Sequence, residues 1–226
     1  MKHPKRSPVT VVFDLGGVLL DWDPRHLYRK LFNGDEAAME SFLAEICTTD
    51  WHYNHDLGRS FDEGAKLLYG QHPEKTALIK AWGERFDEMV SGSIENTVDI
   101  LAELRARGTP IYALTNYPTE AFVIARKRFE FLDWFLGMVV SGEEKVAKPD
   151  SQIYAILIER YKIDPRRAVF IDDSEKNVAV AQALGFIGIQ FTSPATLRLE
   201  LQALGLLQVP GQKVRKDPSA FSPRSQ

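Results

Sequence analysis

An apolar run near the start of the chain ends abruptly at a carboxylate. Residues 11–13 read Val-Val-Phe, Asp14 follows, and Gly16 and Gly17 then let the backbone turn away. A β-branched run of this length is typical of a strand buried on both faces of a parallel sheet. Burying an unpaired carboxylate at the end of such a strand is costly, so Asp14 is the first candidate for chemistry.

After residue 92 the chain alternates between short β-branched runs and segments with helical spacing of apolar positions. Strands are expected at 111–114, 138–140, 168–171 and 187–190, and helices at 96–107, 118–129, 151–161, 175–184 and 193–205. Strands that alternate with helices predict right-handed βαβ crossovers. We therefore expect an α/β fold, a Rossmann-like parallel sheet with helices on both faces.

Residues 24–92 show helical spacing and no strand-like run. Helices are expected at 25–32, 35–46, 60–69 and 73–90. His52 and His55 fall in a predicted loop between the second and third of these helices, which faces either a substrate or the solvent. Four helices inserted after the first strand predict a small helical-bundle cap domain. We thus expect a catalytic core at 9–21 and 93–207, a cap at 22–92, and flexible tails at 1–8 and 208–226.

Charge and composition narrow the class of protein. The 226 residues are 44% hydrophobic and 26% charged, with a net charge of -3. The first eight residues carry +3 and the last sixteen carry +3, so the body between them carries -9, which argues against a nucleic-acid surface. No apolar run approaches the length of a membrane span. Cys47 is the single cysteine, which excludes an intrachain disulfide and fits a reducing compartment, so we expect a cytoplasmic enzyme, monomeric or homodimeric.

Polar residues follow three of the predicted strands. Asp14 follows the first, Thr115 and Asn116 follow the second, and Asp172 and Asp173 follow the fourth. Because the carboxyl ends of parallel strands form the ligand-binding edge of such a sheet, we expect these side chains to lie close together.

A lysine adds one positive charge to this edge. Lys148 precedes Pro149 at the predicted start of a helix, which restricts its backbone to an extended conformation. Two carboxylates about 4 Å apart repel by roughly 4 kcal/mol at an effective dielectric constant near 20. The three negative charges of Asp14, Asp172 and Asp173 exceed the single positive charge of Lys148. A divalent cation would balance them, and oxygen ligands favour Mg²⁺. The pattern indicates phosphoryl transfer, with a carboxylate nucleophile, Mg²⁺, and a lysine and a hydroxyl that hold the phosphate of a small-molecule substrate.

Four segments in this order resemble the motifs of the haloacid dehalogenase superfamily. They are 13–19 (Phe-Asp-Leu-Gly-Gly-Val-Leu), 114–116 (Leu-Thr-Asn), 148–150 (Lys-Pro-Asp) and 170–174 (Phe-Ile-Asp-Asp-Ser). The helical insert is similar to the cap of the first subclass of this superfamily.

The resemblance implies a role for each residue that matches a motif. It implies that Asp14 is the nucleophile and forms an aspartyl-phosphate, and that Thr115 and Asn116 bind the phosphate. Lys148 would stabilise the charged intermediate. The implied metal ligands are Asp14, the carbonyl of Gly16, Asp173 and, beside it, Asp172.

Gly16 departs from the common phosphatase pattern, which has a second Asp at this position as general acid. Dehalogenases of the superfamily also lack this Asp, but they usually replace the acidic fourth motif and need no metal, whereas this chain keeps Asp172 and Asp173. A sugar-1-phosphate phosphatase group combines a similar Asp-Leu-Gly with the acidic fourth motif. We expect a Mg²⁺-dependent phosphatase of a small phosphorylated metabolite, with a 2-haloacid dehalogenase and a non-catalytic phosphate-binding relic as alternatives.

The missing acid leaves two possibilities open. Either Asp21, Asp23 or a histidine of the cap replaces it, or the enzyme prefers leaving groups that need little protonation. General acid catalysis contributes about 10²- to 10⁴-fold, so the difference is measurable. Asp21 and Asp23 can equally well cap the next helix or form surface ion pairs.

Overall fold

The computed structural model describes residues 9–209, and a five-stranded parallel sheet forms their centre. The strand order is β5-β4-β1-β6-β7. The strands are β1 (Thr10–Phe13), β4 (Ile111–Thr115), β5 (Gly137–Val140), β6 (Ala168–Asp172) and β7 (Ile187–Gln190). The predicted parallel sheet is confirmed. The predicted tails lie outside the described residues, except for residues 208 and 209.

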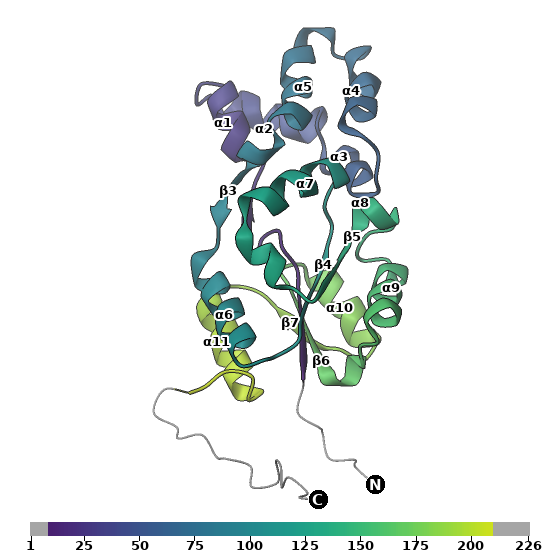
Figure 1. Ribbon diagram of the computed structural model, residues 1–226. Helices are drawn as coiled ribbons and strands as arrows, with labels where there is room; N and C mark the ends of the chain where they lie inside the picture. Colours follow the sequence, from purple (N-terminus) through teal and green to yellow (C-terminus); the bar gives the residue numbers. More distant parts are fainter. Residues whose placement is uncertain (1–8, 210–226) are drawn as a thin grey trace, which may run out of the picture.

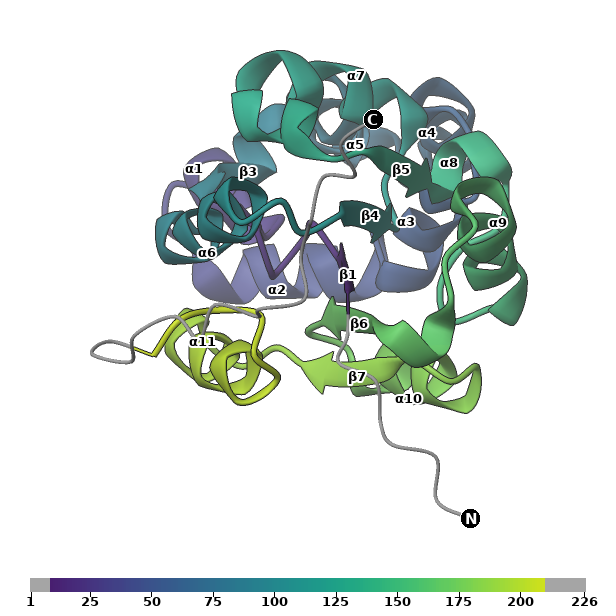
Figure 2. The same ribbon diagram turned by 60° about the horizontal axis from the view of Figure 1, so that its bottom comes forward.

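Helices cover both faces of this sheet, as Figure 2 shows. They are α6 (Glu95–Ala106) and α11 (Pro194–Ala203) on one face, and α9 (Ser151–Tyr161) and α10 (Glu175–Ala183) on the other. The strand residues alternate between these layers because successive side chains of a strand point to opposite faces. Val11 and Phe13 join the apolar cluster of α6 and α11, whereas Val12 joins the cluster of α9 and α10.

A group of helices lies beyond the carboxyl end of β1, at the top of Figure 1. They are α1 (Arg25–Leu31), α2 (Glu36–Glu45), α3 (Thr49–Asp56), α4 (Phe61–Tyr69), α5 (Thr76–Glu84) and the 3-10 helices η1 (Pro73–Lys75) and η2 (Phe86–Met89). The chain enters this group through β2 (Leu20–Trp22) and leaves it through β3 (Val90–Ser93), and these two strands pair antiparallel. The two connections therefore run side by side. The division into core and cap at residues 22–92 stays a prediction.

Three details of this helical region differ from the sequence prediction. The predicted loop around His52 and His55 is helix α3. Thr48 caps this helix by accepting a hydrogen bond from the backbone N–H of Trp51 at 3.1 Å. The predicted helix at 73–90 is broken into η1, α5 and η2, and the unpredicted strand β3 follows it because Val90 pairs with Trp22 of β2.

The remaining elements are short or lie over the sheet edge. They are α7 (Thr119–Arg128), α8 (Ser141–Glu144), η3 (Glu130–Trp134) and η4 (Pro165–Arg167). In residues 9–209, none of the helices is long and apolar enough to cross a membrane.

Candidate active site

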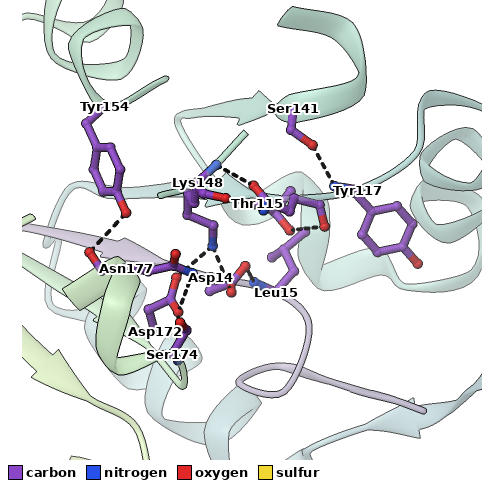
Figure 3. Close-up of polar contacts among 11 residues, drawn as sticks. Asp14, Leu15, Thr115, Tyr117, Ser141, Lys148, Tyr154, Asp172, Ser174 and Asn177 are labelled. Carbon is purple, nitrogen blue, oxygen red and sulfur yellow. Dashed lines mark hydrogen bonds and ion pairs between the residues drawn. The ribbon is translucent and has the colours of Figure 1, made fainter. Parts of the chain in front are cut away.

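The polar residues that follow the strands meet at one edge of the sheet, as the sequence predicts. β1 lies between β4 and β6, so Asp14 after β1 is flanked by Thr115 at the end of β4 and Asp172 at the end of β6. The N–H of Asp14 donates to the carbonyl of Ile171 at 2.8 Å, which extends the pairing of β1 with β6 to the site. Figure 3 shows the side chains converging there.

Lys148 connects two of these carboxylates. Its Nζ lies 2.8 Å from Asp14 Oδ2 and 2.7 Å from Asp172 Oδ2, and the residue is only 2% exposed. Burial alone would lower the pKa of this ammonium group, but the two carboxylates raise it above its usual value. Lys148 is therefore a fixed positive charge inside the protein.

Asp14 is held at both of its oxygens. Oδ2 contacts Lys148, and Oδ1 accepts a hydrogen bond from the N–H of Leu15 at 2.7 Å. Burial raises the pKa of Asp14 to about 8, opposed by the Lys148 ammonium and assisted by Asp172. A divalent cation at these oxygens would favour the ionised form, which is the form that attacks as a nucleophile.

Asp172 is fully buried, and its oxygens are used within the protein. Oδ1 accepts hydrogen bonds from the N–H of Ser174 and from Nδ2 of Asn177, each at 2.9 Å, and Oδ2 contacts Lys148. Tyr154 in turn donates to the carbonyl of Asn177 at 3.0 Å. Sequence reasoning missed Asn177, although it lies in the helix directly after the Asp172–Asp173 pair. These contacts position Asp172 to hold Lys148.

Thr115 and Asn116 are both predicted to bind phosphate, and their side chains have different surroundings. The Asn116 amide pairs with the backbone of Lys148: Nδ2 donates to the Lys148 carbonyl at 2.9 Å, and the Lys148 N–H donates to Oδ1 at 2.8 Å. These contacts use one hydrogen and one oxygen lone pair of the Asn116 amide, so phosphate binding by Asn116 stays a prediction. The Thr115 hydroxyl makes one long contact of 3.5 Å with the Asn116 carbonyl and is fully buried, so its role at the phosphate also stays a prediction.

The predicted metal ligands form a cluster of oxygens. One carboxylate oxygen from each of Asp14, Asp172 and Asp173 lies within 4.8 Å of the others, and Asp173 is exposed. Because Lys148 balances only one of these three charges, the cluster fits a divalent cation. Oxygen donors suit Mg²⁺, so the residues present are compatible with the predicted metal.

The two glycines after Asp14 have different surroundings. Gly17 has a φ of +71°, and a Cβ there would lie 2.5 Å from Asp173 Oδ2. A Cβ at Gly16 would have no heavy atom within 4 Å. The absence of an acid at position 16 is therefore not imposed by crowding.

The residues predicted as substitute acids are engaged elsewhere. The Asp21 side chain is half exposed, and a hydrogen bond from the Ser91 hydroxyl is the main cause of its lowered pKa. Asp23 Oδ1 accepts from the N–H of Arg25 at 2.9 Å and lies 3.3 Å from Nη1 of the same residue. Burial lowers the pKa of His52 to about 3 and of His55 to about 4, so neither ring is in the acidic imidazolium form at neutral pH.

Comparison with known proteins now identifies the family. The family model of the haloacid dehalogenase-like hydrolases matches residues 9–185, which is most of the chain. The chain belongs to this family. It is therefore a hydrolase, as the order of its motifs predicts.

Relatives of this haloacid dehalogenase-like hydrolase include named phosphatases. The chain is 24% identical to a sesquiterpene phosphatase of Aspergillus oryzae, over 85% of this chain and 94% of the relative. It is 26% identical to a phosphorylated carbohydrates phosphatase of Thermotoga maritima, over 77% of this chain and 81% of the relative. A solved family enzyme from Bacteroides thetaiotaomicron, in complex with magnesium and inorganic phosphate, has a TM-score of 0.62 at 24% identity, covering 82% of this chain and 94% of that chain. This last likeness shows the shared fold.

The contrast between the two glycines gives a first prediction for this haloacid dehalogenase-like site. Gly17→Ala adds a Cβ against Asp173 and strains a positive φ, which costs about 1–2 kcal/mol. We expect a lower melting temperature and at least about tenfold weaker Mg²⁺ binding, measured by calorimetry. Gly16→Ala is the matched control and should change neither quantity appreciably. Equal effects of the two substitutions would contradict this placement of Asp173.

Asn116 gives a second prediction. Asn116→Ala removes two hydrogen bonds to the Lys148 backbone, each worth about 1 kcal/mol, so it should lower the free energy of unfolding by about 2 kcal/mol. Because Lys148 loses its anchor, hydrolysis should slow by roughly tenfold or more. Asn54→Ala, which removes an exposed side-chain contact to the Asp50 carbonyl, is the control. If Asn116→Ala changed only the Michaelis constant, the residue would instead bind substrate directly.

Proposed function

We propose that this hydrolase is a Mg²⁺-dependent phosphatase that acts on a small phosphorylated metabolite through a phosphoryl group carried on Asp14. The observation that supports it most strongly is Lys148 bound between Asp14 and Asp172 beside the exposed Asp173 carboxylate. The named phosphatases among the relatives support the same activity.

Each residue of the site has a task in this reaction. The Asp14 carboxylate attacks phosphorus, the bond from phosphorus to the leaving oxygen breaks, and water then attacks the phosphorus of the aspartyl-phosphate. Lys148 offsets the negative charge on the transferred group, and the Thr115 hydroxyl donates to one of its oxygens. Asn116 and Asp172 hold Lys148 in place.

Asp14, Asp173 and the carbonyl of Gly16 would hold the cation, with Asp172 beside them. Bound Mg²⁺ would neutralise phosphate oxygens and relieve the repulsion within the acidic cluster. Dehalogenation needs no such cation, so retention of Asp172 and Asp173 supports phosphoryl transfer over attack on carbon.

A cavity in the helical region supports the choice of leaving group. It has a volume of about 280 Å³, and Trp22, Leu43, Cys47, His52 and Trp82 contribute to its walls. Within residues 9–209, three buried ring nitrogens of this lining have no hydrogen-bond partner: Trp22 Nε1, His52 Nδ1 and Trp82 Nε1.

This lining has consequences for the substrate class. The aromatic faces suit a carbon-rich ring, and Arg25, Glu40 and Thr49, which also line the cavity, can pair with the hydroxyl groups of a sugar. A pure hydrocarbon would cover these polar side chains without offering them a hydrogen bond, at a cost of about 1–3 kcal/mol for each group left unpaired. We therefore propose a leaving group that bears oxygens, such as the sugar of a sugar phosphate, in preference to a hydrocarbon chain.

Hydrolysis of p-nitrophenyl phosphate tests the proposed activity. We expect turnover with Mg²⁺, loss of turnover with EDTA, and a fall of roughly 10³-fold or more in Asp14→Asn. Asp23→Asn, which alters only local contacts with Arg25 at the start of α1, should retain most of the activity. Turnover that survives EDTA or the loss of the Asp14 carboxylate would refute the mechanism. Metal-independent halide release from 2-chloropropionate would instead support the dehalogenase alternative.

A further inference from the structure

The proposed reaction lacks an obvious proton donor for the leaving oxygen. Position 16, where many phosphatases of this family carry the acid, is a glycine with open space around it. Asp21, Asp23, His52 and His55 are excluded by the contacts and pKa shifts described above. If the reaction uses a general acid, the donor is therefore another side chain that reaches the same edge of the sheet.

Asp56 is a buried carboxyl group at the last position of α3. It is 8% exposed, and within residues 9–209 its Oδ1 receives no hydrogen bond. The nearest charged or titratable partner is His52 Nε2, one helical turn earlier, at 3.7 Å from Oδ1. Because that imidazole is neutral, Asp56 has no salt bridge to hold it ionised.

The end of α3 lies against the catalytic edge. A Cβ at Gly58, two residues after Asp56, would lie 2.7 Å from the carbonyl of Gly142 in α8. Against the rise that burial causes, the Lys148 ammonium lowers the pKa of Asp56, and, in addition to burial, the Asp56 carboxylate raises the pKa of Tyr117, which follows the Thr115–Asn116 pair. The end of α3 that carries Asp56 therefore packs beside the catalytic edge.

Asp56 also adjoins the proposed leaving-group cavity. His52 lines that cavity and stacks on Trp22 with ring centroids 5.1 Å apart. Asp56 follows His52 by one helical turn on the same face of α3. Asp56 therefore lies one helical turn from the lining of this cavity.

We propose that Asp56 is the general acid of this enzyme and replaces the carboxyl group missing at position 16. In the first step the Asp14 carboxylate bonds to phosphorus, the phosphorus–oxygen bond of the substrate breaks, and the Asp56 proton passes to the leaving oxygen to give an alcohol. In the second step the Asp56 carboxylate takes a proton from the water that attacks the aspartyl-phosphate. This step releases phosphate and restores both groups, so the two steps sum to hydrolysis of a phosphate monoester.

The protonation state of Asp56 agrees with this role. Burial raises its pKa to about 7, and the Lys148 ammonium opposes this rise. Three titratable groups near Asp56 are uncharged at neutral pH and do not offset the burial: His52, Tyr53 and Tyr117. Lys145 is also nearby, where its alkyl chain packs close to Gly58. A substantial fraction of Asp56 therefore carries the proton at neutral pH.

Two leaving groups of different basicity test this assignment, which rests on the proposed phosphatase function. Hexyl phosphate needs a proton on its leaving oxygen, whereas 2,4-dinitrophenyl phosphate does not. We expect Asp56→Asn to lower kcat/KM by about 10²- to 10³-fold for hexyl phosphate and by less than about threefold for the dinitrophenyl ester. The ratio kcat/KM reports the first step, to which the acid contributes. Asp50→Asn, on the exposed first turn of the same helix, should leave both values unchanged.

Each alternative outcome has a clear meaning. Equal losses on both esters would show that Asp56 only supports the structure, and an unchanged rate on hexyl phosphate would also overturn the proposal. A wild-type enzyme that hydrolyses the dinitrophenyl ester but neither hexyl phosphate nor any sugar phosphate would show that it works without an acid. If the wild-type enzyme hydrolysed neither ester, the proposed phosphatase function itself would fail.

The pH dependence of the wild-type enzyme provides a test that needs no variant. The protonated form of Asp56 is the acid, so the ratio of kcat/KM for hexyl phosphate to that for the dinitrophenyl ester should fall as the pH rises through about 7. Taking the ratio cancels the titration of Asp14, and kcat/KM for each ester is calculated on the concentration of its dianion because the two phosphate groups have different second pKa values. A ratio that stays constant across this range would refute the assignment.

Discussion

The site depends on one buried ammonium group held between two carboxylates. Lys148 contacts Asp14 and Asp172 at 2.8 and 2.7 Å, and all three residues are withdrawn from solvent. Removing one partner of such a buried arrangement leaves an uncompensated charge, which typically costs 3–5 kcal/mol. The hydrogen bonds of Asn116, Asn177 and Ser174 can be understood from this constraint, because each fixes one member of the arrangement.

The sheet topology explains how residues so far apart in sequence reach this point. β1 carries Asp14 at the centre, and its neighbours β4 and β6 end at Thr115 and Asp172. The helical region lies above the same edge and adds the end of α3. The acidic site and the cavity of the helical region therefore come from separate parts of the chain, so under the proposed function the substrate could change with the cavity while the site stays the same.

The sequence predicted the sheet and the meeting of Asp14, Lys148 and Asp172, because strand ends in a parallel sheet must share an edge. Helix α3 escaped prediction because its residues, from Thr49 to Asp56, show no apolar stripe. Its buried side chains are one aromatic and two polar ones, Trp51, His55 and Asp56, and a sequence pattern of this kind favours a loop. The pairing of Asn116 with the Lys148 backbone was also not predicted, because a side-chain amide beside a strand end can bind several partners equally well. Asp56 had no motif to mark it, and only the packing of α3 on α8 reveals where it lies.

The central claim is that Asp14 carries the phosphoryl group during turnover. Mass spectrometry of enzyme quenched in acid during steady-state hydrolysis of a phosphate monoester tests it most directly. The account predicts a peptide that contains Asp14 and has gained the mass of one phosphoryl group, and no such peptide in Asp14→Asn. Product formation with the phosphoryl group on another residue, or with none on the Asp14 peptide at any time, would contradict the account.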